Sequence, residues 1–337
     1  MSSFVTRNKP IWDELESLVQ RYRKSKRSML PHDLKRLDAL YRQTTIHLSQ
    51  VATRSTDKRL EDYLNSLVSS AHEMIYLPPR RSLWRGMTTF LREGFARAIA
   101  RNWQYHLVSA ALVTLGGLLA YFASTQDPQA AYAMMPAEDV RQPGSNQEQL
   151  LQVLRSGRDM GGGGKFFFAS FLFSHNLKVG ILAMGLGVLA AVPTVLLMVF
   201  NGMMLGSFVA IHHQAGITTE FWAWILPHGV TEIGAIILCG GCGLMLGKAI
   251  VNPGIVSRGE SLRRAGIEAG STCVGVTLML IVAAVIESYL RQSHLDSTAR
   301  LLFAGITALF WITYFATGLS RERMAREFEQ LKSDDLA

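Results

Sequence analysis

After residue 105 the chain contains apolar runs that are too long for the helices of a soluble core. A run of 18 or more apolar residues predicts a membrane span, because about 20 helical residues cross the hydrocarbon layer. The runs lack strand-like alternation, and lipid requires backbone hydrogen bonds to be satisfied within the protein. We therefore predict an all-α polytopic membrane helix bundle of about six spans: 105–123, 167–190, 193–212, 222–247, 270–290 and 301–319.

The stretch 166–213 is the weak point of this count, because it is too long for one crossing. Pro193 divides it into two spans, since proline interrupts the helical hydrogen-bond ladder. The alternative is one span followed by a re-entrant segment, because residues 190–192 are apolar and a turn that faces water is normally polar. Two spans place both basic termini on one side of the membrane, and we favour them for that reason.

The distribution of positive charge predicts the orientation. Residues 1–104 contain 19 Lys and Arg against 10 Asp and Glu. Arginines also lie in the loop 248–269 and at the start of the tail 321–337. Segment 125–165 carries a net charge of −1. The positive-inside rule thus places the N- and C-termini in the cytoplasm and 125–165 outside, in a multi-pass protein of the cell membrane. The same rule accounts for the basic half, so the expected partner is the lipid bilayer and not nucleic acid.

The region before the first span divides in two. Residues 1–79 show helical periodicity and predict a cytoplasmic domain of about three helices, with boundaries at Pro31 and Ser55-Thr56-Asp57 and a hinge at Pro78-Pro79. Residues 80–104 combine bulky apolar side chains with basic ones and predict an amphipathic interfacial helix, an elbow before the first span. The alternative is another helix of the soluble bundle. The expected membrane-surface arginines are Arg85, Arg92, Arg97 and Arg101.

The candidate site lies in the fourth span. His228 and Glu232 are four residues apart, hence on one helical face, and Pro227 frees a nearby backbone carbonyl. Three interpretations stay open: a polar lock between helices, a path for a proton, ion or solute, and a metal site for hydrolysis with His212 and His213 as further ligands. The zinc-protease pattern His-Glu-x-x-His is absent, and we predict no bound metal, no cofactor and no enzyme activity.

Small residues surround this pair. Asn201 lies in mid-span and must find a partner, and Gly202 with Gly206 forms a face for close helix approach. The same spacing recurs at Gly243 with Gly247 and at Gly266 with Gly270, which predicts tight packing within the bundle or a homo-oligomer seam. The pair Cys239 and Cys242, although spaced as Cys-x-x-Cys, is expected to serve packing as well.

Other polar positions are expected to be structurally ordinary. Asn176, Lys178 and Glu287 lie at the edges of spans, where long side chains normally reach the interface. The run Gly161–Gly164 lacks the Lys-Ser/Thr ending of a phosphate-binding loop and predicts a hinge.

Three motifs, in order, carry a resemblance to a known family. They are Asn201-Gly202 with Gly206, then Leu226-Pro227-His228-Gly229 with Glu232, then Gly240-Gly241 with Gly243-Leu244 and Leu246-Gly247. Together they resemble the stage II sporulation protein M family of bacterial integral membrane proteins, over roughly residues 105–320. The long N-terminal region is similar to the branch found in bacteria that do not sporulate.

The resemblance implies a function. The sporulation member is a membrane anchor that recruits peptidoglycan-degrading partners at the division septum, and it is not itself the hydrolase. The family motif carries over to an intramembrane cluster of Asn201, Gly202, Gly206, Pro227, His228, Gly229, Glu232, Gly241 and Gly247. The leading hypothesis is a non-enzymatic membrane scaffold whose partners are other membrane or envelope proteins. The alternative is a transporter or channel that uses His228 and Glu232.

Overall fold

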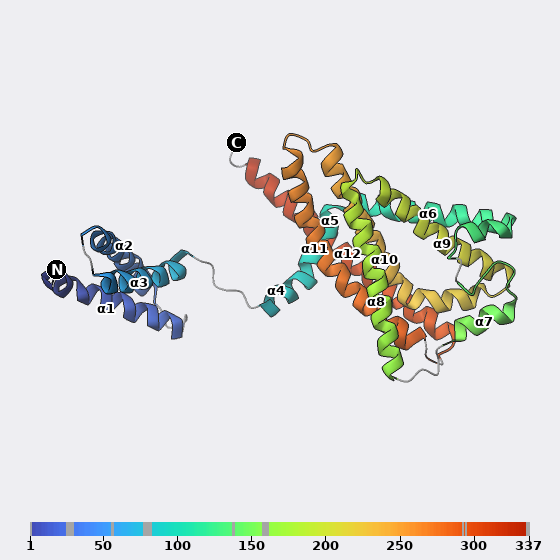
Figure 1. Cartoon of the computed structure of the whole chain (residues 1–337), viewed down its shortest axis with the longest axis horizontal. Coiled ribbons are helices and arrows are strands. Elements are labelled where there is room, and N and C mark those ends of the chain that lie inside the picture. The colour runs from blue at the N-terminus through green and yellow to red at the C-terminus, as the bar shows by residue number, and fades with distance from the viewer. Residues whose placement is uncertain are drawn as a thin grey trace. The chain divides into compact units, whose positions relative to one another are not determined.

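A computed structural model describes residues 2–24, 30–54, 57–76, 83–136, 139–156, 162–291, 293 and 295–334. These residues are almost entirely helical and contain no strand. They form two compact units, Met1–Gly86 and Met87–Ala337 (Figure 1). Ser55 and Thr56 of the predicted boundary and the predicted hinge at Pro78-Pro79 lie outside the described residues, while Asp57 directly precedes the helix that starts at Lys58.

The N-terminal unit contains three helices, in agreement with the predicted helical domain. They are α1 (Ser2–Lys24), α2 (Pro31–Arg54) and α3 (Lys58–Tyr76), and each packs against the other two. Every helix places apolar residues at helical spacing on its inner face, which gives the unit its own core. That core is built around the buried side chains of Trp12, Leu15, Leu37, Leu40 and Leu64.

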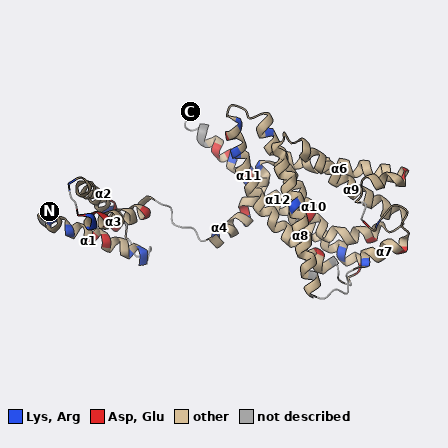
Figure 2. Cartoon of the chain, in the orientation of Figure 1, with Lys and Arg blue, Asp and Glu red and all other residues tan. Residues whose placement is uncertain are grey.

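Six long apolar helices make up most of the second unit. They are α6 (Trp103–Gln126), α8 (Gly162–Gly185), α9 (Val192–Gln214), α10 (Thr218–Val251), α11 (Arg258–Ile286) and α12 (Ser297–Asp334). Each is long and apolar enough to cross a membrane, so the prediction of about six spans is confirmed. Helices α6 and α9 contain no Lys, Arg, Asp or Glu (Figure 2), and they pack along each other. Helix α10 is central, since it contacts α6, α8, α9, α11 and α12.

The stretch 166–213 is divided into two separate helices, as Pro193 predicts. Helix α8 ends in a 3₁₀ turn, η4 (Leu186–Val188), and α9 starts at Val192. Ala190 and Ala191 between them adopt positive φ angles of 57° and 63°. The buried Thr194 hydroxyl then donates a hydrogen bond of 2.8 Å to the carbonyl oxygen of Ala183. This bond ties the start of α9 to the end of α8.

Shorter segments connect these helices. Before α6 come α4 (Leu83–Thr89), the π-helical turn η2 (Phe90–Gly94) and α5 (Phe95–Arg101). Between α6 and α8 lie the 3₁₀ helix η3 (Pro128–Ala133) and α7 (Gln147–Arg155), and the π-helical turn η5 (Glu287–Arg291) extends α11. The glycine run predicted as a hinge instead starts a helix, because α8 begins at Gly162; Gly161 lies outside the described residues.

Candidate functional site

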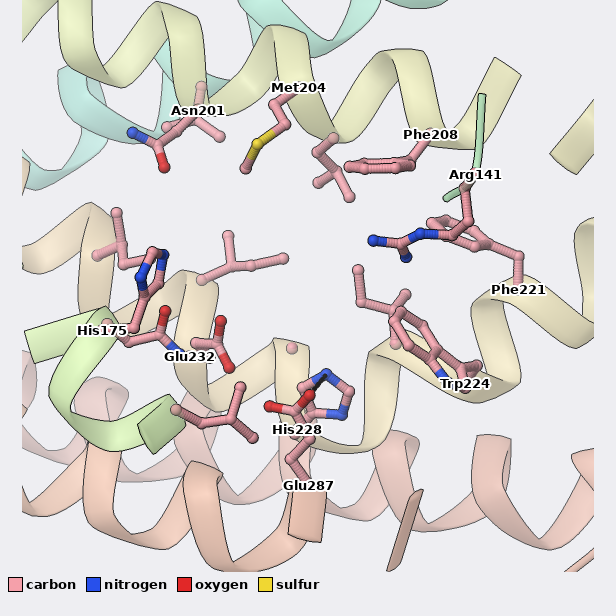
Figure 3. Close-up of a pocket in the computed structure, with 18 residues that line it drawn as sticks. Arg141, His175, Asn201, Met204, Phe208, Phe221, Trp224, His228, Glu232 and Glu287 are labelled. Carbon is pink, nitrogen blue, oxygen red and sulfur yellow. Dashed lines mark ion pairs between the residues drawn. The ribbon is translucent and has the colours of Figure 1, made fainter. Parts of the chain in front are cut away.

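The second unit encloses a cavity of about 270 Å³. Its apolar wall comes from α9 and α10, through Phe208, Phe221 and Trp224 among others. Its polar groups come from five different segments of the chain, and Figure 3 shows several of them directed into the same space. They are Arg141, His175, Asn176, Asn201, His228, Glu232 and Glu287. A cavity with this many polar groups among apolar helices is a candidate binding site.

His228 and Glu232 lie one turn apart on α10, which continues through Pro227 without a break. Both side chains line the cavity, so the prediction that they share a helical face is confirmed. The imidazole of His228 is only 4% exposed, while Glu232 is partly buried. The backbone spacing of an α-helix is sufficient to bring these two groups together.

Glu287 is the third member of this group, and its predicted position was wrong. It was expected to reach the membrane interface, but its side chain is turned inward and the residue is 5% exposed. Its Oε1 lies 3.8 Å from Nε2 of His228 (Figure 3). Glu287 begins the π-helical turn η5, and the change of helical pitch there alters the direction in which its side chain leaves the backbone.

Arg141 is another cavity residue that sequence reasoning missed, as are His175 and Asn176 of α8. It belongs to the segment predicted to lie outside the membrane, yet its guanidinium carbon lies 4.1 Å from the ring centre of Phe208 and 5.3 Å from that of Trp224. Asp139 accepts two hydrogen bonds from this guanidinium, at 2.9 and 2.6 Å. Burial acts to raise the pKa of Asp139, but the bonds and charge of Arg141 outweigh burial and lower that pKa overall.

The motif residues on α9 divide between two tasks. Asn201 lines the cavity and satisfies its amide by donating a 2.8 Å hydrogen bond to the carbonyl oxygen of Leu197. Gly202 and Gly206 face α6 instead. A β-carbon at either position would overlap a backbone carbonyl oxygen of α6, so these glycines allow the two helices to touch backbone to backbone.

The motif residues on α10 also have different roles. Gly241 contacts His106 of α6, and Gly247 contacts Ala191, in each case with no space for a β-carbon. Gly229 lines the cavity and Pro227 is buried inside the helix. Gly266 and Gly270, by contrast, have no neighbour where a β-carbon would stand. The predicted close packing within the bundle therefore applies to the glycines of α9 and α10 and not to those two.

His212 and His213, considered as further metal ligands, are engaged elsewhere. Nδ1 of the buried His212 lies 2.7 Å from the carbonyl oxygen of Phe208, and His213 pairs with the hydroxyl of Tyr121. Among the described residues, the histidine and acidic side chains able to share one metal ion are His228, Glu232 and Glu287, with ligand atoms all within 4.8 Å of one another.

The four predicted membrane-surface arginines lie in two settings. Arg85 is on α4 and Arg92 on η2. Arg97 forms an ion pair of 3.1 Å with Glu322, and Arg101 one of 2.8 Å with Glu268. The apolar face of α5 between them packs on α11 and α12. The role of these arginines at a lipid surface stays a prediction.

A bundle of six membrane-length apolar helices around a polar cavity defines a polytopic α-helical membrane protein. Residues 109–291 match the family model of Stage II sporulation protein M, and the chain belongs to that family. Residues 2–77 match a second model, described as Domain of unknown function (DUF8413). No curated protein and no solved structure matches the chain.

Proposed function

We propose that this protein is a non-enzymatic membrane scaffold that organises an envelope complex, such as a peptidoglycan-remodelling assembly. The observation that carries the proposal is that the chain has two units of different kinds. One unit is a helical domain with its own core, and the other is a membrane bundle held by backbone contacts. Such a chain is suited to present a folded domain at a membrane.

The packing of the membrane unit supports this function. Gly202 and Gly206 bring α9 against the backbone of α6, and Gly241 of α10 packs on His106 of the same helix. The contacts between α6 and α9 fix these helices at one separation, because there is no side chain between the backbones that could change rotamer. A scaffold needs this fixed geometry, since its task is to hold partners in place.

The proposal includes an orientation and a class of partner. Both termini lie in the cytoplasm, because basic residues precede α6 and others lie in the C-terminal part of α12, after residue 320. The partners are other membrane or envelope proteins, and the N-terminal unit, whose charged residues lie mainly at its surface, binds them. The segment that carries Arg141 and α7 lies on the outer side.

In-cell photo-crosslinking of the full chain tests the scaffold. A photo-reactive amino acid is placed at Ile46, which is 59% exposed on α2, and in a matched variant at Val140, which is 71% exposed in the outer segment. We expect discrete protein adducts from Ile46 that persist when Glu232 is changed to Gln. If Ile46 gives no discrete adduct, or if Glu232→Gln removes it, the scaffold function of the N-terminal unit is contradicted.

A second candidate function is transport of an ion or small solute, and the polar cavity favours it. Ionisable groups inside a membrane bundle commonly mark such pathways. Flux in proteoliposomes distinguishes the two functions. A transporter loses its flux in Glu232→Gln but keeps it in Glu220→Gln, which alters an exposed residue of the first turn of α10. A wild-type protein without flux of protons, Na⁺, K⁺ or divalent cations excludes transport of these ions.

A further inference from the structure

Three side chains with metal-binding atoms meet at one wall of the cavity. His228 and Glu232 come from the middle of α10, and Glu287 comes from η5 at the end of α11. Their ligand atoms lie within 4.8 Å of one another, and Nε2 of His228 lies 3.8 Å from Oε1 of Glu287. Two helical segments far apart in sequence therefore contribute to a single cluster.

The cluster brings two acidic side chains and one imidazole together inside a bundle of apolar helices. A divalent cation attracts carboxylate oxygens strongly in such a medium of low dielectric, and it would also use the imidazole nitrogen as a ligand.

We propose that His228, Glu232 and Glu287 form a binding site for one divalent transition-metal cation of the Mn²⁺, Fe²⁺, Co²⁺ and Zn²⁺ class. One imidazole and two carboxylates are a donor set that these ions accept, whereas Mg²⁺ and Ca²⁺ prefer oxygen ligands alone. This inference goes beyond the scaffold function and does not depend on it.

The distances in the cluster fit such an ion after a small movement. Metal–ligand bonds of about 2.0–2.2 Å place neighbouring donor atoms roughly 3–3.5 Å apart. The separation of 3.8 Å between His228 and Glu287 is already near this range, and the remaining separations, within 4.8 Å, must shorten by about 1 Å. Rotation of the two glutamate side chains can supply this movement. The adjoining cavity leaves space for water to complete the coordination.

The other polar groups of the cavity do not prevent cation binding. Arg141 lies across the cavity from His228 and Glu287 (Figure 3), and its charge is offset by the paired carboxylate of Asp139. Asn176 and Asn201 are neutral. His175 also lines the cavity but does not belong to the group of ligand atoms. It therefore offers a matched control within the same space.

The proposed ion would join α10 to the end of α11. Helices α10 and α11 already pack together along their length, and a metal at η5 would fix the far end of that pair. The expected consequence is a metal-dependent gain in stability, since a ligand that binds only the folded state stabilises it by mass action.

Co²⁺ binding to the full-length protein in detergent tests the site. The protein carries an affinity tag without histidines and is washed with chelator before titration, and the visible d–d absorption of Co²⁺ reports coordination directly. We expect one Co²⁺ per chain in the wild type and in His175→Gln. In His228→Gln and Glu287→Gln the affinity for Co²⁺ should fall by about tenfold or more. Loss of an outer-shell contact already has an effect of this size, and loss of a ligand should have at least the same effect. Zn²⁺ should displace the Co²⁺ and raise the melting temperature of the wild type.

Two results would overturn the proposal. One is a wild-type protein that takes up no Co²⁺ after the chelator wash. The other is equal uptake by His228→Gln, Glu287→Gln and the wild type, which means that Co²⁺ binds elsewhere. Glu287→Asp keeps a carboxylate on a shorter stem, and a changed Co²⁺ spectrum in this variant supports the site even where the Gln variants do not fold.

Discussion

Gly202 on α9 faces the carbonyl oxygen of Val113 on α6 with no space for a side chain between them. The neighbouring atoms are backbone atoms, so they cannot move aside by a rotamer change. Gly202→Ala should therefore separate the two helices or strain them, at a cost of about 1–3 kcal/mol. Thermal unfolding of the purified protein in detergent would show this as a lower melting temperature.

Gly266→Ala is the matched control for this substitution. Gly266 lies on α11, and no atom stands within 4 Å of the position that a β-carbon would take. Alanine there should be neutral or stabilise the helix by up to about 1 kcal/mol, because alanine has the higher helix propensity. Equal losses of stability in the two variants would show that α6 and α9 do not make this contact.

A partly buried hydrogen bond joins α12 to α10. Nε1 of Trp311 donates to the hydroxyl of Thr231 over 2.9 Å, and Thr231 is fully buried. Thr231→Val keeps the shape of the side chain but leaves the indole N–H without this acceptor, which should cost about 1–3 kcal/mol. Thr231→Ser keeps the hydroxyl and should lose less. The melting temperatures of the two variants compare these effects, and a Val variant as stable as the Ser variant would contradict the bond.

The membrane helices could be predicted from sequence because their signal is local. Runs of apolar residues fix the number of spans by length alone, and Pro193 marks the division between α8 and α9. The shared face of His228 and Glu232 is equally local, since it follows from a spacing of four residues. Each of these inferences needs only the geometry of one helix.

The rest of the site depends on which helices meet, and no local pattern encodes that. Glu287 lies 55 positions after Glu232, at the end of a span, where an acidic residue ordinarily reaches water. Only the packing of α11 on α10 and the turn η5 bring it to His228. Arg141 was missed for a similar reason, because it lies in a polar segment whose fold over α9 and α10 leaves no periodic signal.

The orientation of the chain can be checked with single cysteines. Glu148 is exposed on α7 and Glu329 is exposed near the end of α12. In a protein with Cys273 changed to Ser, a membrane-impermeant maleimide should label Glu148→Cys in intact cells and Glu329→Cys only after the cells are opened. This follows from the Lys and Arg residues that lie before the first span and directly after the last predicted span. Labelling of both cysteines in intact cells would contradict the proposed topology.

The N-terminal unit should lose stability in acid through His47. Nε1 of Trp12 donates a 3.1 Å hydrogen bond to Nδ1 of His47, which can accept it only while that nitrogen carries no proton. Burial lowers the pKa of His47 below its ordinary value of 6.5. Between the lowered pKa and 6.5 the unfolded chain binds more protons than the folded one, so stability falls as the pH drops through this window and is constant above it.

Hydrogen–deuterium exchange of the full-length protein measures this effect locally. Peptides from α1 and α2 should exchange faster at about pH 5 than at about pH 8, after correction for the intrinsic pH dependence of exchange. His47→Gln supplies the control, because its amide oxygen can accept the Trp12 hydrogen bond but does not titrate. The corrected difference between the two pH values should therefore shrink in this variant. An unchanged difference would assign the acid sensitivity of the unit to another group.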